Sequence, residues 1–79
     1  MSEHDTIYVA LLDEGIDVWR PVAAERLAPA RYLIVDQDYD PGIERWEFEP
    51  GTVVRCRKEK RDGRHVLVAT EAARRTLAG

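Results

Sequence analysis

The segment that most constrains the fold lies near the end of the chain, where Asp62 and Gly63 separate two strand-like runs, residues 52–58 and 65–69. An Asp-Gly pair tolerates the positive φ angles of a type I′ turn, whose twist matches that of paired antiparallel strands. In the first run Val54 and Cys56 alternate with Arg55 and Arg57, as in a strand with one buried face. We therefore predict a β-hairpin in this part of the chain.

Short apolar runs between turn signals predict further strands upstream, over residues 6–12, 16–22, 31–35 and 45–49. Pro21 cannot donate to a ladder, so we expect an edge or a bulge there, with the strand continuing over residues 23–27. Five or six such strands predict an all-β domain, a small antiparallel barrel or strongly bent sheet that is SH3-like, because closure removes exposed edges. Thr70 is expected to cap a short C-terminal helix over residues 71–78.

The length and composition of the chain fit one small β domain over residues 1–79, with frayed ends at 1–5 and 78–79. Hydrophobic residues make up 44% and charged residues 34%, which is typical of a folded soluble protein. The start is polar and acidic, and no apolar run approaches the roughly 20 residues of a membrane helix. Cys56 is the single cysteine, so no intramolecular disulfide can form. We expect a cytoplasmic protein with no membrane association.

Charge is distributed unevenly along the chain. Residues 1–50 hold twelve acidic and four basic residues, a balance of −8, whereas residues 51–79 hold three acidic and eight basic residues, a balance of +5. One interpretation is that the hairpin neutralises acidic strands nearby, since both signs are commonly interspersed on a surface. The other is a basic face for a nucleic acid or an acidic partner.

The acidic segment between the third and fourth predicted strands has the spacing of a calcium loop. Asp36, Asp38 and Asp40 match positions one, three and five of an EF-hand, and Glu47 falls at position twelve. Position six, where the sharp turn needs glycine, is Pro41, and strand-like runs stand where helices should be. The segment is therefore predicted to be an acidic loop without metal, ended by a type II turn at Pro41 and Gly42.

No set of residues with the spacing of a catalytic centre is found in the sequence. Arg55 and Arg57 flank Cys56 and would lower the pKa of its thiol if they faced it. In a strand, however, the neighbours of Cys56 point to the opposite face, and Val54 marks the cysteine face as apolar. We predict a buried structural thiol, no enzyme activity and no cofactor.

The aromatic residues divide between the core and a candidate binding surface. Trp46 and Phe48 are expected in the core, because a domain this small needs its large side chains there. Trp19 stands beside Arg20, just before the break at Pro21, and tryptophan and arginine are favoured at binding hot spots. We predict a protein-interaction module whose contacts are Trp19, Arg20, Asp36, Asp38 and Asp40.

The alternative is a nucleic-acid-associated module that uses the basic hairpin. Its candidate contacts are Arg55, Arg57, Lys58, Lys60, Arg61 and Arg64. Such a face could follow a phosphate backbone, but the hairpin has no interleaved aromatic residues on which bases would stack. A homodimer is a further expectation, because a chain this small can cover an open sheet edge with its own copy.

Four segments resemble a family of short bacterial proteins with no assigned activity. They are residues 8–15 (YVALLDEG), 18–22 (VWRPV), 46–48 (WEF) and 50–56 (PGTVVRC), which follow the family pattern LLDEG…VWRPV…W.F.PG..V.C. The resemblance spans roughly residues 6–69 and is most specific in the VWRPV block. It implies a bacterial, intracellular, stand-alone domain and no particular ligand.

Overall fold

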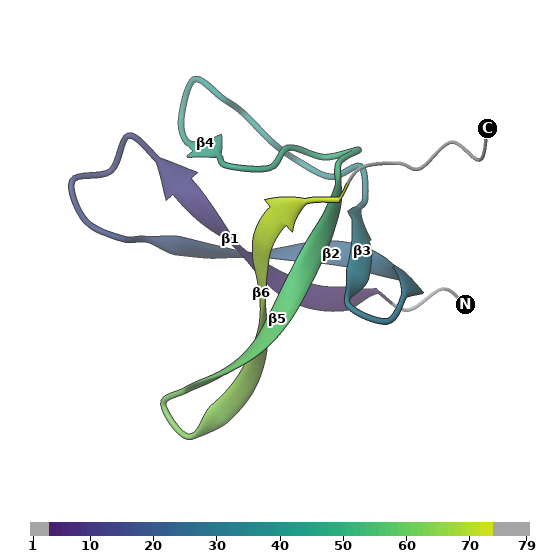
Figure 1. Ribbon diagram of the computed structural model, residues 1–79. Coiled ribbons are helices and arrows are strands. Elements are labelled where there is room, and N and C mark those ends of the chain that lie inside the picture. Colours follow the sequence, from purple (N-terminus) through teal and green to yellow (C-terminus); the bar gives the residue numbers. More distant parts are fainter. Residues whose placement is uncertain (1–3, 74–79) are drawn as a thin grey trace.

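Six β-strands and no helix make up residues 4–73, the part of the chain that the computed structural model describes (Figure 1). The strands are β1 (Asp5–Leu12), β2 (Trp19–Ala28), β3 (Arg31–Ile34), β4 (Arg45–Trp46), β5 (Val53–Arg61) and β6 (Arg64–Ala72). The prediction of a small all-β domain with five or six strands is confirmed. Within residues 4–73, no helix is present that could cross a membrane.

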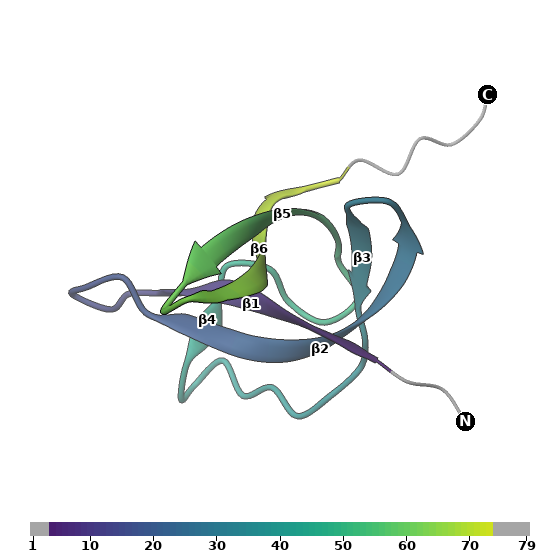
Figure 2. The ribbon, with the colours of Figure 1, turned by 90° about the horizontal axis from the view of Figure 1, so that it is seen from below.

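Five strands close into a ring in the order β1, β2, β3, β5 and β6, with β6 returning to β1 (Figure 2). The four pairs along this order are antiparallel. The pair that closes the ring, β1 with β6, is parallel, which corrects the expectation of an entirely antiparallel sheet. Strand direction alternates along the four antiparallel pairs, so the first and last of five strands run the same way and can close the ring only as a parallel pair.

The short strand β4 extends the sheet beyond the point where β6 leaves β1. Leu11 stands opposite Trp46, and the Glu47 N–H donates to the Ala10 carbonyl at 2.8 Å. The strand predicted over residues 45–49 is thus shorter in the structure, because the chain bends at Glu47 and Phe48. This arrangement places the segment before β4 at the end of the barrel where β1 finishes.

Pro21 lies within β2 at a position that has only one neighbouring strand. It stands opposite Tyr8 of β1, whereas β3 joins the other side of β2 only from Ala24 onward. An edge position does not need the missing N–H, as predicted for this proline. Residues 23–27 continue the strand as expected, and the register with β3 shifts between Arg26 and Ala28.

The long β5–β6 hairpin extends beyond the rest of the sheet (Figure 1). Its turn residues Asp62 and Gly63 have φ angles of 52° and 76°, so the predicted type I′ turn is confirmed. At the other end of the hairpin, Glu71 and Ala72 pair with β5 rather than starting a helix. The helix predicted over residues 71–78 is therefore wrong at its start, and residues 74–78 lie outside the described part of the chain.

The core fills the inside of the ring and follows the period-two pattern of the strands. Ile7 and Val9 of β1 are fully buried, and Val54 and Cys56 of β5 face the same interior, as predicted. Trp46 is 3% exposed, which confirms it as a core residue, whereas Phe48 is partly buried and packs against the core from its edge. The buried cluster comprises Ile7, Val9, Val22, Ala24, Tyr32, Ile34, Trp46, Val54, Cys56 and Ala69.

Candidate binding surfaces

Trp19 and Arg20 are consecutive residues at the start of β2, and the strand separates their side chains. Trp19 stands opposite Ala10, so it lies on the outer face of the barrel, whereas Arg20 stands opposite Val9 and belongs to the other face. Trp19 lies under the tip of the β5–β6 hairpin, and Arg20 contacts the segment before β4. The predicted interaction site is therefore divided between two surfaces.

The first surface, which we call the loop hollow, has a volume of about 430 Å³. It is lined by Arg20, Asp38, Tyr39, Asp40, Ile43 and Glu44. The Arg20 Nε lies 3.2 Å from Glu44 Oε1, and the same oxygen accepts a hydrogen bond of 2.9 Å from the indole N–H of Trp46. Three predicted contacts, Arg20, Asp38 and Asp40, are thus brought together, and Glu44 connects the arginine to the core.

Tyr39 holds the loop that lines the loop hollow against Trp46 of β4. Its ring centroid lies 4.6 Å from that of Trp46, and its hydroxyl donates to Glu49 Oε2 at 3.0 Å while accepting from the Trp46 backbone N–H at 3.3 Å. Desolvation raises the pKa of the Tyr39 phenol, and the neighbouring Glu49 carboxylate raises it further. Tyr39 is therefore a neutral hydrogen-bonding group that orders the loop rather than a reactive phenolate.

The turn after Tyr39 differs from the predicted type II turn. The Asp40 carbonyl accepts from both Ile43 N–H at 2.9 Å and Glu44 N–H at 3.0 Å, which is a helix-like turn. Gly42 does not take the positive φ that a type II turn requires, and its N–H donates instead to Asp40 Oδ1 at 2.9 Å. The Asp40 side chain therefore stabilises the turn through this hydrogen bond. Ile43, which lies in the turn, is 81% exposed.

Asp36 lies apart from the other aspartates. It lines a separate hollow with Leu33 and Gly51. Among residues 4–73, no three carboxylate, imidazole or thiol groups lie close enough together to hold a metal ion. Asp36 is therefore not among the residues that line the loop hollow, whereas Asp38 and Asp40 are.

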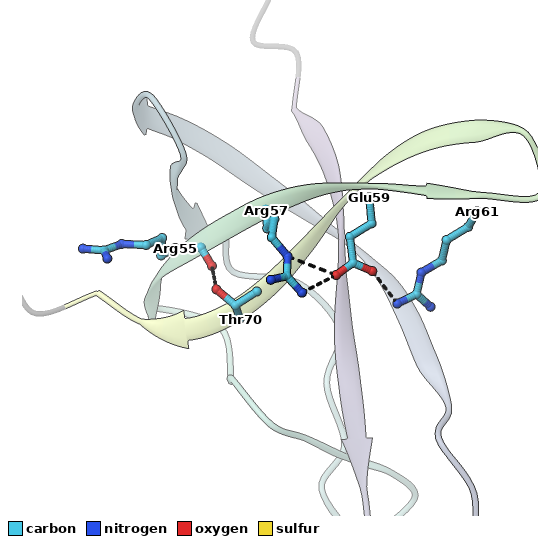
Figure 3. A network of polar contacts seen from close by, with 5 residues as sticks. All are labelled: Arg55, Arg57, Glu59, Arg61 and Thr70. Carbon is cyan, nitrogen blue, oxygen red and sulfur yellow. Dashed lines mark hydrogen bonds and ion pairs between the residues drawn. The ribbon is translucent and has the colours of Figure 1, made fainter.

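The basic side chains of β5 are largely engaged with carboxylates on the outer face (Figure 3). Both Arg57 and Arg61 reach Glu59 at 2.8 Å, and these hydrogen bonds, first that of Arg61 and then that of Arg57, hold the pKa of Glu59 below its usual value. Arg55 points away from this group and lies 3.9 Å from Glu71. The three arginines therefore do not form a continuous basic surface, because the carboxylates of Glu59 and Glu71 lie among them.

The remaining basic residues of the hairpin, Lys58, Lys60 and Arg64, make no ion pair with any residue in the described range 4–73. Lys58 and Lys60 stand opposite Leu67 and His65, and Arg64 stands opposite Arg61 next to the turn. The six candidates for a nucleic-acid face are thus spread over both faces of the hairpin, because side chains alternate along its strands.

The second surface, which we call the hairpin hollow, lies where the hairpin tip meets β1 and β2 and has a volume of about 270 Å³. It is lined by Tyr8, Trp19, Arg61, Asp62, Arg64, His65 and Val66. The Arg61 guanidinium carbon lies 5.0 Å from the Trp19 ring centroid, which is a cation–π contact. A residue from the predicted protein-binding set therefore shares a surface with two residues from the predicted nucleic-acid set.

Cys56 is buried, as predicted, and its surroundings oppose ionisation. Burial raises the pKa of the Cys56 thiol from 9.0 to about 11, so the nucleophilic thiolate is scarce near neutral pH. Arg55 and Arg57 are exposed on the outer face and do not approach the thiol.

Three residues that line the loop hollow, Tyr39, Ile43 and Glu44, were not among the contacts predicted from the sequence. Ile43 is an isolated apolar residue between Gly42 and Glu44, and an apolar side chain that fits no strand alternation was the available signal. Glu44 had no such signal, because its importance comes from contacts with Arg20 and Trp46 that are distant in sequence.

Comparison with protein-family models gives no match. The curated proteins include none that is significantly similar to this chain, and no solved structure matches it. The resemblance drawn from the LLDEG and VWRPV segments therefore stays a prediction.

Proposed function

We propose that this protein is a small non-catalytic β-barrel that binds another protein through the end of the barrel where β1 finishes. This surface, the loop end, comprises residues 12–18 and the loop hollow. The observation that carries the proposal is the position of exposed apolar side chains. Three of the four large hydrophobic residues exposed within residues 4–73 lie at this end, namely Leu12, Ile16 and Ile43, and the last two are 77% and 81% exposed.

Each of the two loops that carry these isoleucines is joined to a strand by an ion pair. Arg45 lies 3.1 Å from Asp13, which joins the loop after β1 to β4, and Arg20 lies 3.2 Å from Glu44. Large apolar side chains that are exposed and surrounded by charged groups are typical of protein interaction sites. A preordered surface also loses less conformational entropy on binding than mobile loops would.

The charge of the loop end indicates the chemistry of its partner. Acidic residues outnumber basic ones there, with Asp13, Glu14, Asp17, Asp38, Asp40 and Glu44 against Arg20. We therefore expect a partner with basic and apolar side chains, because complementary charge speeds association and rejects acidic competitors. A cytoplasmic location belongs to the same proposal and remains to be tested by fractionation.

Binding of nucleic acid through the hairpin remains the second candidate. Its support is the presence of Lys58, Lys60 and Arg64 without carboxylate partners among the described residues. It ranks below protein binding because Glu59 occupies both Arg57 and Arg61, and because a phosphate backbone needs a continuous basic track on one face.

Affinity capture with matched variants tests the proposal. We expect the tagged protein to retain a partner protein through nuclease treatment and moderate salt. The double variant Ile16→Ser, Ile43→Ser should weaken capture by at least roughly tenfold, because each buried isoleucine contributes about 1.5–3 kcal/mol. Leu27→Ser is the matched control, since Leu27 is 51% exposed at the opposite end of the barrel.

Two results would count against protein binding at the loop end. One is capture that disappears with nuclease and falls steeply with salt, which would favour the basic hairpin. The other is an equal loss of the partner with Leu27→Ser, which would place the interface elsewhere.

A further inference from the structure

The outer face of the barrel carries a small apolar layer that is separate from the core. Tyr8 of β1 stands opposite Val68 of β6, and Trp19 stands opposite Ala10, so these side chains emerge on the outside of the sheet. Val68 is 2% exposed but does not belong to the buried core cluster. Tyr8 and Trp19 are only partly covered, and they form the apolar wall of the hairpin hollow.

Arg61 is held in a fixed position at the rim of this wall. Its guanidinium lies over the Trp19 ring at 5.0 Å, and its Nη2 donates to Glu59 Oε1 at 2.8 Å. Glu59 is in turn held by Arg57 through two hydrogen bonds, of 2.8 and 3.2 Å (Figure 3). A guanidinium has five N–H donors in a rigid fork, so Arg61 keeps donors for a second acceptor.

Arg64 stands directly opposite Arg61 across the hairpin, next to the type I′ turn. Like charges in this position repel each other, because directly opposed side chains lie close together. Glu59 compensates Arg61, whereas Arg64 has no carboxylate partner among residues 4–73. An anion bound between the two guanidinium groups would remove the repulsion.

We propose that the hairpin hollow binds an acidic peptide segment, with a carboxylate between Arg61 and Arg64 and the neighbouring apolar side chain against Trp19 and Tyr8. Arginine forks match carboxylates geometrically, and a tryptophan face favours apolar and aromatic groups. The volume of about 270 Å³ is close to the lower limit of roughly 300 Å³ for small-ligand pockets, so the hollow accepts one or two side chains.

The observations favour a carboxylate-bearing peptide over a nucleic acid. Two arginines, Arg61 and Arg64, line the hollow, which is enough for one carboxylate but is not the continuous basic track that a phosphate backbone needs. This site is distinct from the loop end, which is acidic and shares none of its residues, so either proposal can fail alone.

Titration of the ¹⁵N-labelled protein with an acetylated, amidated Glu-Glu-Phe-Glu-Glu peptide tests the site. We expect saturable shifts of the Trp19 indole N–H and the Gly63 amide signals, and no such shifts with the Gln-Gln-Phe-Gln-Gln peptide. Arg64→Gln should weaken binding by roughly tenfold, because hydrogen bonds to charged groups are lost. Lys58→Gln removes the same charge from the same hairpin outside the hollow, and should change the affinity by less than about twofold.

Several results would overturn this inference. They are the absence of shifts at Trp19 and Gly63 up to saturating peptide, equal weakening by Arg64→Gln and Lys58→Gln, and tighter binding of octathymidylate at the same signals. The unchanged Trp46 indole signal verifies that each variant is folded, since Trp46 is buried in the core.

Discussion

The side chain of Gln37 takes the place of a strand residue beside β2. Its amide nitrogen donates to the carbonyls of Ala23 at 2.9 Å and Val35 at 2.8 Å, and its Oε1 accepts from the Ala23 N–H at 3.0 Å. β3 pairs with β2 only from Ala24 onward, and although the Ala23 carbonyl also accepts from the Val35 N–H at 3.2 Å, the Ala23 N–H has its partner in Gln37. Gln37 therefore closes the sheet edge and holds the start of the acidic loop.

We expect Gln37→Ala to lower the free energy of unfolding by about 1–3 kcal/mol, because partly buried backbone groups lose their partners. Urea denaturation followed by Trp fluorescence measures this change. Asp38→Ala is the control at the neighbouring exposed position and should stay within about 0.5 kcal/mol of the wild type. A similar loss in both variants would show that Gln37 contributes no more than a surface residue.

The β5–β6 hairpin is the element on which the second surface depends, because its turn places Arg61 and Arg64 beside Trp19. Asp62 and Gly63 both have positive φ, and the glycine adopts this conformation without strain. A Cβ added at Gly63 would meet no atom within 4 Å. The effect of a substitution there therefore reports backbone conformation alone.

We expect Gly63→Ala to cost about 1 kcal/mol of stability and to weaken the Arg61–Trp19 contact, because alanine disfavours a φ of 76°. Gly15→Ala is a matched control, since Gly15 also has open space around it but lacks a positive φ. It should leave the stability unchanged or raise it slightly. Thermal unfolding of both variants measures the difference, and an equal loss in both would contradict the role of the turn.

At the scale of the whole molecule, all five strands of the ring contribute side chains to a single hydrophobic core. Cys56 of β5 lies in the same buried cluster as Ile7 of β1 and Trp46 of β4. Ring closure pairs the central parts of the five strands, whereas the first residues of β2 and the far part of β5 have a partner strand on one side only, and dimerisation stays an untested prediction. Because Cys56 is buried in this core, ionisation of its thiol changes the free energy of unfolding of the whole domain.

Stability should fall as the pH rises from about 9 to about 11. Burial raises the pKa of Cys56 from 9.0 to about 11 in the folded state, so the unfolded chain loses the thiol proton first and binds fewer protons over this range. Below pH 9 both states keep the proton and the contribution is constant. Urea denaturation at several pH values measures the slope, and the Cys56→Ala variant should lack this part of it. Identical slopes in the two proteins would contradict the shift.

The sequence by itself determined the features that are encoded in neighbouring residues. The Asp62-Gly63 turn, the strand at Pro21 and the core face that carries Val54 and Cys56 were all predicted correctly, since turn chemistry and period-two alternation are local properties. Where local signals conflicted with long-range pairing, as at Glu71 and Ala72, the prediction was wrong, because a short helix cannot compete with a paired strand.

Only the tertiary structure decided which distant segments meet. The parallel closure joins Ile7 to Leu67, and the division of the predicted site follows from Trp19 meeting Arg61 while Arg20 meets Glu44. These contacts depend on the ring register and on the reach of long side chains, neither of which leaves a pattern within a few consecutive residues. Most candidate residues could therefore be identified from the sequence, but only the fold shows that they lie on two separate surfaces.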